Sequence, residues 1–152
     1  MNIHKYFYDE YYKDVSEFAH RYSKVKNPHI VGVYSSSLPM AVHLSSVMKC
    51  PLSIIKVEDD KARWLINYTE DKSVRPKDCP LFPRLLVVDI NYGTGNSFRA
   101  IKQLPQFIQN PDDTFFSLFG NTNEDNVYFK YEQLFKEIVL PWNLVKDIND
   151  EK

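Results

Sequence analysis

The sequence is poor in cysteine and in long apolar runs, and these shortages exclude several classes of protein. Its 152 residues contain two cysteines, Cys50 and Cys79, which form no metal-type pair. Isolated cysteines are typical of a reducing compartment rather than of a disulfide-stapled scaffold. No apolar run approaches the roughly 20 residues of a membrane-spanning helix, and the aromatic, charged N-terminus lacks the apolar stretch of a signal peptide. We therefore expect a cytoplasmic protein with no membrane partner.

A surplus of charge of one sign is also missing. The chain has 19 Lys and Arg against 20 Asp and Glu, a net charge of −1, so nothing indicates a nucleic-acid partner. Its four histidines are scattered without the spacing of a metal site, and there is no nucleophile elbow. Because no repeat or linker divides the chain, we expect a single domain over residues 1–152.

The chain does contain alternating helical and strand patterns. Predicted helices cover about 6–24, 38–48 and 97–108, and predicted strands cover 29–34, 52–57, 63–68, 85–90, 114–119 and 127–131. This order predicts an α/β fold, a mostly parallel sheet with a Rossmann-like core and helices on both faces. Residues 58–84 contain the possible strand 63–68 and then a run rich in charge and proline; the segment is predicted as a mobile hood, with a long loop of the kind that often covers an active site.

The stretch from Leu85 to Leu104 reads as a buried strand, a tight turn and the start of a helix. Two of the four glycines, Gly93 and Gly95, lie in this turn. The N–H groups of such a turn and the helix dipole converge on one point, where Thr94 and Ser97 add hydroxyl donors. The pattern predicts a phosphate site, although glycines in a turn can also serve only to relieve backbone strain.

Asp89 is the one acid in an otherwise apolar strand. A carboxylate among Leu and Val is costly unless it is paired or faces a crevice. We interpret it as a ligand for sugar hydroxyls or for magnesium-bound water. The alternative is an acid that caps a neighbouring backbone group.

Three segments together resemble one enzyme family. The central motif is VVDINYGTGNSFRA, residues 87–100, and it resembles the phosphoribosyl diphosphate (PRPP) binding motif of type I phosphoribosyltransferases. Residues 30–57, IVGVYSSSLPMAVHLSSVMKCPLSIIKV, resemble the family's first strand, diphosphate loop, helix and second strand. Residues 137–143, EIVLPWN, resemble the C-terminal segment of many purine-type members.

The resemblance implies an activity and a set of site residues. Members transfer a 5-phosphoribosyl group from PRPP to a nitrogenous base with Mg²⁺, releasing diphosphate. Asp89 matches an acid that holds the ribose hydroxyls and, indirectly, the metal, and residues 58–84 match the mobile hood. The N- and C-terminal segments would form a small hood over the base. The remaining matched positions are Gly93, Thr94, Gly95, Asn96 and Ser97 for the 5′-phosphate, Ser35, Ser36 and Ser37 for diphosphate, and Phe135 or Trp142 for the base.

The chain also departs from the family pattern. Ile90 and Gly93 stand where acids are usual, and the diphosphate loop is all serine, without its usual basic residue. Lys56 and the cations of the hood, Arg63, Lys72, Arg75 and Lys77, are candidates to compensate, or else solvated charges. Arg99 is interpreted as a surface residue.

Three hypotheses follow from this pattern. The first is a phosphoribosyltransferase, possible as a homodimer, acting in purine salvage on PRPP and a purine-type base. The second is a nucleotide- or sugar-phosphate-binding module that has lost transfer chemistry and senses, sequesters or regulates; its ligand would be PRPP or a nucleoside monophosphate. The third is a protein-interaction domain with a vestigial phosphate loop.

Overall fold

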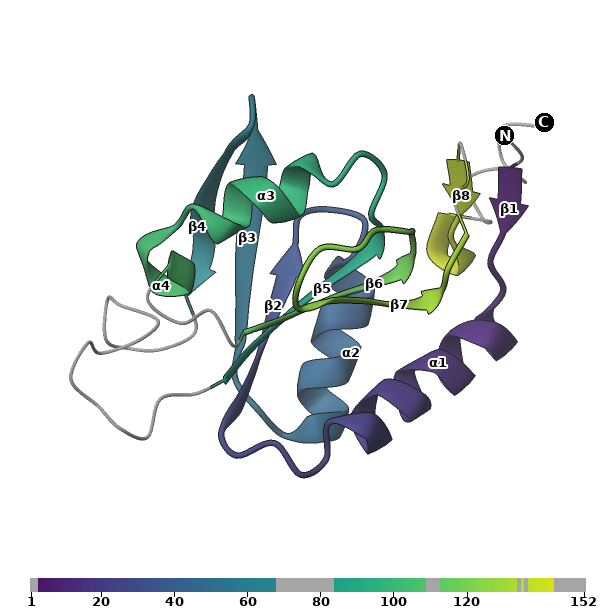
Figure 1. The fold of residues 1–152 in the computed structure, drawn as a ribbon. Coiled ribbons are helices and arrows are strands. Elements are labelled where there is room, and N and C mark those ends of the chain that lie inside the picture. Colours follow the sequence, from purple (N-terminus) through teal and green to yellow (C-terminus); the bar gives the residue numbers. More distant parts are fainter. Residues whose placement is uncertain (1–2, 68–83, 109–112, 134, 136, 144–152) are drawn as a thin grey trace.

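A six-stranded sheet forms the centre of the protein in the computed structural model, which describes residues 3–67, 84–108, 113–133, 135 and 137–143 (Figure 1). The strand order is β4-β3-β2-β5-β6-β7. All neighbouring pairs are parallel except β3 and β4, which are antiparallel. The strands are β2 (Pro28–Val33), β3 (Leu52–Glu58), β4 (Lys61–Asn67), β5 (Arg84–Asn91), β6 (Thr114–Phe119) and β7 (Val127–Tyr131).

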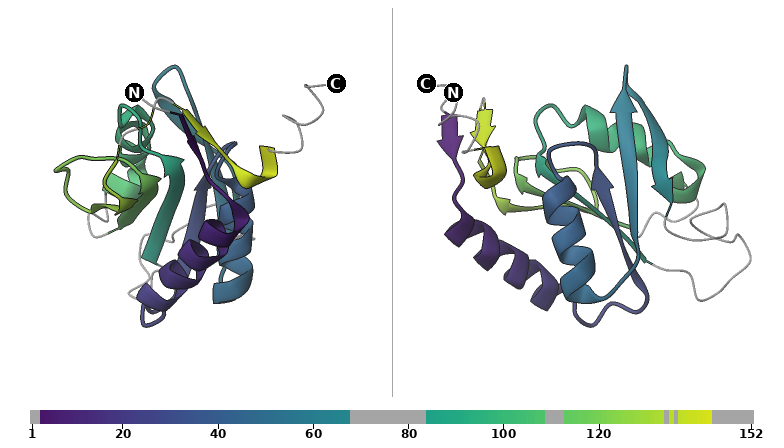
Figure 2. Two further views of the ribbon diagram at one scale, coloured as in Figure 1. Left: turned by 90° about the vertical axis from the view of Figure 1, so that its right-hand side faces the viewer. Right: turned by 180° about the vertical axis from the view of Figure 1, so that it is seen from behind.

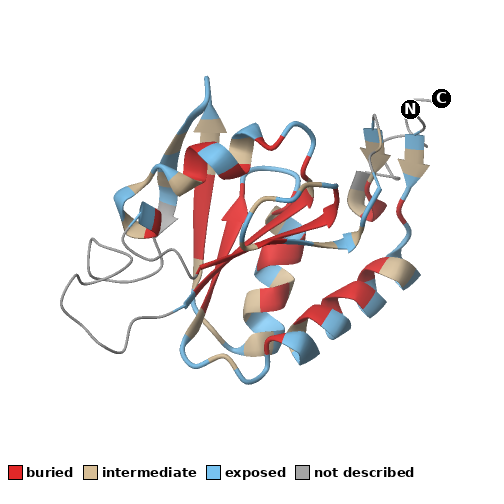
Figure 3. Ribbon diagram, viewed as in Figure 1, coloured by how far each residue is buried: buried red, intermediate tan, exposed pale blue. Residues whose placement is uncertain are grey.

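Helices cover both faces of this sheet, as the predicted α/β class requires. Helices α1 (Tyr8–Arg21) and α2 (Leu38–Met48) lie on one face, and α3 (Asn96–Lys102) and α4 (Pro105–Ile108) lie on the other (Figure 2). The central strands are therefore buried from both sides (Figure 3). Strands covered on both faces read as continuous apolar runs, which is why β5 and β6 are predicted correctly from the sequence.

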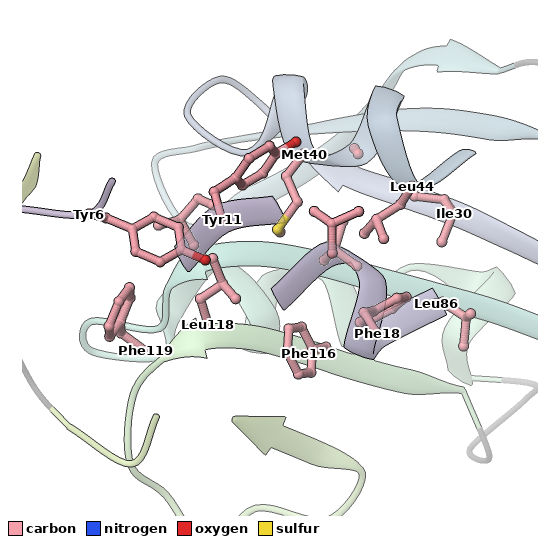
Figure 4. Packing of buried hydrophobic residues seen from close by; sticks show 14 of the residues in the cluster. Tyr6, Tyr11, Phe18, Ile30, Met40, Leu44, Leu86, Phe116, Leu118 and Phe119 are labelled. Atoms are coloured by element: carbon pink, nitrogen blue, oxygen red, sulfur yellow. The ribbon is translucent and has the colours of Figure 1, made fainter. Parts of the chain in front are cut away.

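Successive residues of β5 point to opposite faces and so join two apolar clusters. Leu86, Val88 and Ile90 pack with residues of α1 and α2, such as Phe18 and Leu44 (Figure 4). Leu85 and Val87 pack on the other side with residues of α3 and α4. This alternation places Asp89 on the same side of the strand as the α3 cluster.

The predicted helix 97–108 is wrong in its continuity. Helix α3 ends at Lys102 and a separate short helix, α4, begins at Pro105. Pro105 has no N–H to donate to the carbonyl of Ile101, and the N–H of Leu104 donates to that carbonyl instead (3.0 Å). Proline suits the first position of the next helix, so the break becomes a new start.

Within the predicted hood 58–84, the expected strand 63–68 is confirmed as β4 (Lys61–Asn67), which begins two residues earlier and forms a hairpin that is not predicted. Strand β3 continues through Glu58, and β4 returns antiparallel beside it after a tight turn at Asp59 and Asp60. Both turn residues have positive φ, 51° and 60°, as two-residue hairpin turns require. Aspartate tolerates this conformation less readily than glycine does, so the sequence carries no strong hairpin signal there. Residues 68–83 lie outside the described residues, and the predicted mobile loop is untested there.

A second, two-stranded sheet joins the two ends of the chain. Strand β1 (Ile3–Lys5) pairs in parallel with β8 (Glu137–Val139), and the N–H of Tyr6 donates to the carbonyl of Val139 (2.8 Å). The N- and C-terminal segments thus come together as expected, beside the main sheet (Figure 1). Three-residue strands are too short to show periodicity, so this pairing is not readable from the sequence. No helix within the described part of the chain is long and apolar enough to cross a membrane.

Candidate functional site

The candidate site lies where two neighbouring parallel strands end. Strands β2 and β5 are adjacent, and from them the sheet continues to β3 on one side and to β6 on the other. At such a reversal of strand order, the loops after the two strands diverge and leave a crevice at the carboxyl edge. The loop after β2 carries Ser35, Ser36 and Ser37, and the loop after β5 carries residues 92–95. The two loops singled out in the sequence are thus neighbours in space.

Asp89 is held in a nearly dry position near the end of β5. Asp89 is only 8% exposed. Its Oδ1 accepts a hydrogen bond from the N–H of Ile90 (2.8 Å). Burial raises the pKa of Asp89 to about 7, and the hydrogen bond from Ile90 offsets only part of that effect. The carboxyl group therefore changes charge near neutral pH, where it can take up or release a proton or bind a cation.

The turn after β5 is closed by one backbone hydrogen bond and one hydrogen bond to a side chain. The N–H of Gly95 donates to the carbonyl of Tyr92 (2.9 Å), and the N–H of Gly93 donates to Oδ1 of Asn91 (3.3 Å). Gly93 and Gly95 have φ of +57° and +81°, a backbone region that other residues rarely adopt. Both glycines are thus required by the shape of the turn.

Hydrogen-bond donors gather at the mouth of this turn. Thr94 and Asn96 are exposed and Ser97 is half-buried. Within the described residues, neither the backbone N–H groups of these three residues nor the hydroxyls of Thr94 and Ser97 have a hydrogen-bond partner. The side chain of Asn96 is already engaged, because its Oδ1 accepts from Arg99 (2.7 Å). The turn therefore offers backbone donors and two hydroxyls to an anion.

The serine loop after β2 presents two hydroxyls rather than three. Ser35 and Ser36 are exposed, whereas Ser37 is fully buried and its hydroxyl donates to the carbonyl of Val33. The peptide bond between Tyr34 and Ser35 is cis. Of the three serines predicted to bind diphosphate, only Ser35 and Ser36 have hydroxyls at the surface.

Lys56 stands beside the serine loop from the neighbouring strand. Its ammonium nitrogen lies 5.4 Å from the centre of the Tyr34 ring and 2.6 Å from Oε1 of Glu58. The structure thus brings a cation to the residue that precedes Ser35. Arg63 pairs with Lys56 across the β3–β4 hairpin and is exposed, and the other predicted hood cations lie outside the described residues.

No family model and no curated protein matches the sequence. Solved structures do superpose on nearly the whole chain. A xanthine-guanine-hypoxanthine phosphoribosyltransferase from Helicobacter pylori has a TM-score of 0.70 at 19% identity, covering 99% of each chain. A purine phosphoribosyltransferase from Pyrococcus horikoshii has a TM-score of 0.68 at 19% identity, covering 93% of this chain and 94% of that one. This chain has the type I phosphoribosyltransferase fold.

A third similar structure holds a bound nucleotide, ppGpp. A hypothetical protein from Neisseria gonorrhoeae with bound ppGpp has a TM-score of 0.63 at 15% identity, covering 99% of this chain and 94% of that one. At these identities the likeness establishes the fold alone. The resemblance of the motif residues to type I phosphoribosyltransferases is therefore confirmed for the fold.

Ile90, one departure from the family pattern, is accounted for by the fold. Its side chain is 1% exposed and packs in the apolar cluster under α1 and α2, on the opposite side of β5 from the α3 cluster. A carboxylate there would lie among apolar side chains at a large desolvation cost. Asp89 is therefore the one acid that β5 contributes near the turn.

The two predicted base-binding aromatics lie in different surroundings. The Phe135 ring stacks on His4 (4.7 Å between centres) and meets the Phe119 ring edge-on (5.5 Å). The Trp142 ring meets the Tyr11 ring edge-on at 5.3 Å. Both are half-buried against the cluster under α1, so each keeps some surface for a ligand. Base binding by either stays a prediction.

The carboxylates at the candidate site suit Mg²⁺ only if phosphates and water supply most of its ligands. Among the residues that the structure describes, no group of three or more His, Cys, Asp or Glu is arranged to hold a metal ion. Mg²⁺ is commonly bound through one or two carboxylates, with substrate phosphates and water as its other ligands. Asp89 fits the role of that single protein carboxylate.

Arg99 is exposed, as expected of a surface residue, but its contacts and those of Glu124 are not predicted from the sequence. Arg99 donates from Nη2 to the carbonyl of Thr94 (2.6 Å) and to Asn96, and from Nη1 to Oε1 of Glu124 (3.1 Å). An arginine two residues after the predicted phosphate turn is a signal for the first two contacts. Nothing in the sequence indicates the contact with Glu124, which comes from the β6–β7 connection.

Proposed function

We propose that this protein binds PRPP and transfers its 5-phosphoribosyl group to a purine-type base, releasing diphosphate. One observation carries the proposal. In a phosphoribosyltransferase fold, the Asp89 strand with its Thr94–Ser97 turn and the Ser35–Ser36 loop end side by side, at the point where strand order reverses. Sites in open α/β sheets occupy this position.

Each part of the site suits one part of PRPP. The N–H groups of the 94–97 turn and the hydroxyls of Thr94 and Ser97 match a 5′-phosphate. The carboxylate of Asp89 matches the ribose hydroxyls and the water shell of Mg²⁺. Ser35, Ser36 and Lys56 match diphosphate, with the lysine supplying the charge that hydroxyls lack. Phe135 or Trp142 would contact the base.

The reaction breaks the bond between the ribose anomeric carbon and the diphosphate oxygen and forms a bond from that carbon to a base nitrogen. The diphosphate oxygen keeps the bonding electron pair, and the ribose carries positive charge as the bond breaks. The base nitrogen gives up its proton to solvent as it bonds to the anomeric carbon. When bound, Mg²⁺ neutralises the charge of the departing diphosphate. The chain's own residues act by holding the sugar and the leaving group in position, because no nucleophile is required from the protein. We place this activity in purine salvage, in a cytoplasmic homodimer.

A binding module without transfer activity is the second candidate. Two observations favour it: β5 offers Asp89 but a buried Ile90 beside it, and the serine loop carries no cation of its own. A site with fewer charges loses catalytic stabilisation before it loses phosphate binding, since a phosphate needs only the 94–97 turn.

Titration calorimetry and a turnover assay separate the two candidates. PRPP, ribose 5-phosphate and nucleoside monophosphates are titrated with and without Mg²⁺, and PRPP is then incubated with adenine, guanine, hypoxanthine and xanthine. Mg²⁺-dependent PRPP binding with nucleotide formation supports the transferase. Binding of a monophosphate without nucleotide formation supports the module, and binding of none of these ligands contradicts both.

Removing the hydroxyls of the turn should weaken phosphate binding. Thr94→Ala and Ser97→Ala together are expected to reduce the affinity for ribose 5-phosphate by about 1–3 kcal/mol, the value of charge-assisted hydrogen bonds. Calorimetry measures the change, and Ser16→Ala, on the exposed side of α1, is the matched control. Unchanged affinity in the double variant would show that the phosphate sits elsewhere.

Replacing Lys56 tests the diphosphate position. Lys56→Met keeps the length of the side chain and removes its charge, so we expect about tenfold weaker binding of inorganic diphosphate, about 1.4 kcal/mol. Binding of ribose 5-phosphate should not change. Lys61→Met, at an exposed position on β4, is the control. Equal diphosphate affinity in both variants would remove Lys56 from the site.

A further inference from the structure

The carbonyl side of the 94–97 turn is held by one guanidinium group, that of Arg99. Nη2 of Arg99 donates to the carbonyl of Thr94 (2.6 Å) and to Oδ1 of Asn96 (2.7 Å). A planar guanidinium presents its donors in a fixed fork, so two acceptors bound to it are also fixed relative to each other. Arg99, on α3, therefore ties the carbonyl of Thr94 in the turn to the side chain of Asn96, the first residue of the helix.

Glu124 holds Arg99 and Tyr92 from outside the turn. Its Oε1 accepts from Nη1 of Arg99 (3.1 Å) and from the hydroxyl of Tyr92 (2.6 Å), and its Oε2 accepts from Nζ of Lys102 (3.3 Å). Burial by itself favours the neutral acid, but the hydrogen bonds from Tyr92, Lys102 and Arg99 and the charge of Lys102 lower the pKa of Glu124. A charged carboxylate thus links three donors at this point.

The turn rests directly on this group of side chains. A Cβ atom at Gly95 would lie 2.3 Å from the Tyr92 hydroxyl oxygen and 2.7 Å from Nη1 of Arg99. The peptide between Thr94 and Gly95 is also held at both edges, its carbonyl by Arg99 and its N–H by the carbonyl of Tyr92. Its orientation is therefore set by side-chain contacts as well as by the turn itself.

We propose that Arg99 and Glu124 are positioning residues for phosphate recognition, which hold the 94–97 donors in the orientation that receives the ligand. This inference rests on the proposed function, because it assigns the phosphate to the same turn. Glu124 lies on the connection between β6 and β7, so a segment remote in sequence controls the geometry of the turn. The conformational entropy of the donors is then already lost in the ligand-free protein, so less is lost when the ligand binds.

A purely electrostatic role and a positioning role predict opposite changes in phosphate affinity when Glu124 is removed. Glu124 carries negative charge beside an anion site, so its removal would tighten phosphate binding if charge alone mattered. If Glu124 acts through the shape of the turn, its removal weakens binding. Arg99→Lys separates the same two effects, because it keeps the positive charge and loses the two-pronged contact.

The experiment measures ribose 5-phosphate and diphosphate affinity by calorimetry in Glu124→Ala, Arg99→Lys and Lys102→Met. We expect about tenfold weaker ribose 5-phosphate binding in the first two, equivalent to about 1.4 kcal/mol, with diphosphate affinity unchanged. Lys102→Met loses an ion pair to the same carboxylate without touching the turn, so its affinities should stay within about twofold of wild type. In the absence of ligand, we also expect faster amide hydrogen exchange at Gly95 in Glu124→Ala and Arg99→Lys than in wild type. This measures the loosening of the turn independently of ligand binding.

Several outcomes overturn the inference. Tighter ribose 5-phosphate binding by Glu124→Ala, or wild-type affinity in Arg99→Lys with unchanged exchange at Gly95, would show that the contacts do not position the turn. Equal weakening for ribose 5-phosphate and diphosphate would indicate a general loss of structure. If wild-type protein binds neither ligand, the proposed function fails and the positioning role fails with it. If Glu124→Ala does not fold, Arg99→Lys decides.

Discussion

Asp89→Asn is expected to stabilise the folded protein at pH 8 while weakening its binding of PRPP. In the folded protein the pKa of Asp89 is about 7, against an ordinary value of 3.8. The folded state therefore binds the proton more tightly than the unfolded state does, and stability falls as pH rises from about 4 to 7. About three pKa units correspond to about 4 kcal/mol, fully lost above pH 7.

Asparagine removes this loss because its side chain carries no charge at any of these pH values. Its Oδ1 can still accept from the N–H of Ile90. Allowing for the burial of an extra amide, we expect a gain of about 2–4 kcal/mol at pH 8, or roughly 5–15 °C in Tm for a chain of this size, and little gain at pH 4. Thermal unfolding followed by circular dichroism at pH 4, 6 and 8 measures this. Asp9→Asn, at an exposed position on α1, is the control.

The same variant should bind Mg²⁺-PRPP about tenfold to a hundredfold more weakly, since it loses charge-assisted contacts to ribose hydroxyls or metal-bound water. In wild-type protein, PRPP affinity should rise between pH 6 and 8 as Asp89 loses its proton, and the variant should show a flat profile. A variant that is more stable and binds as well as wild type would contradict a functional role for Asp89. A variant that is less stable at pH 8 would contradict the raised pKa.

Gly95→Ala is expected to damage the turn after β5 far more than Gly93→Ala. Both glycines have positive φ, which costs an alanine about 1–2 kcal/mol. At Gly95 the new Cβ would also lie 2.3 Å from the hydroxyl oxygen of Tyr92, whereas nothing lies within 4 Å of a Cβ at Gly93. The ring of Tyr92 packs edge-on against Phe98 and Phe129, so it cannot move aside freely.

Overpacking of this kind adds about 1–3 kcal/mol. We therefore expect a loss of about 2–5 kcal/mol in unfolding free energy for Gly95→Ala and about 1–2 kcal/mol for Gly93→Ala, measured by urea unfolding. Ribose 5-phosphate affinity should fall at least about tenfold in the first variant and much less in the second. Similar effects of the two substitutions would show that the contact of Gly95 with Tyr92 and Arg99 does not shape the turn.

The parts of the fold that are predicted correctly are those with a local physical signal. Helix α2 covers Leu38–Met48 and strands β6 and β7 cover Thr114–Phe119 and Val127–Tyr131, as their patterns indicate. Proline in the first turn of α2 and an apolar run between turn residues for β6 act within a few residues. The hairpin at Asp59–Asp60 lacks such a signal because it has no glycine. The break of the predicted helix 97–108 does have one, Pro105, whose ring suits the first position of a new helix.

The candidate site divides in the same way. Asp89 and the 93–97 turn are visible in the sequence because an acid in an apolar strand and closely spaced glycines are unusual in themselves. The burial of the Ser37 hydroxyl and the approach of Lys56 to Tyr34 are not visible. They depend on how α2 and β3 pack on β2, which involves residues from separate segments.

The sequence by itself determined the α/β class, the acid-bearing strand and the glycine turn that follows it, because each depends on residue types a few positions apart. Only the tertiary structure decided which loops become neighbours, that burial raises the pKa of Asp89 to about 7, and that Glu124 holds Arg99 beside the turn. The order of parallel strands, the burial of a carboxylate and a contact across 25 residues all arise from long-range packing of the sheet. No local pattern of residues encodes them.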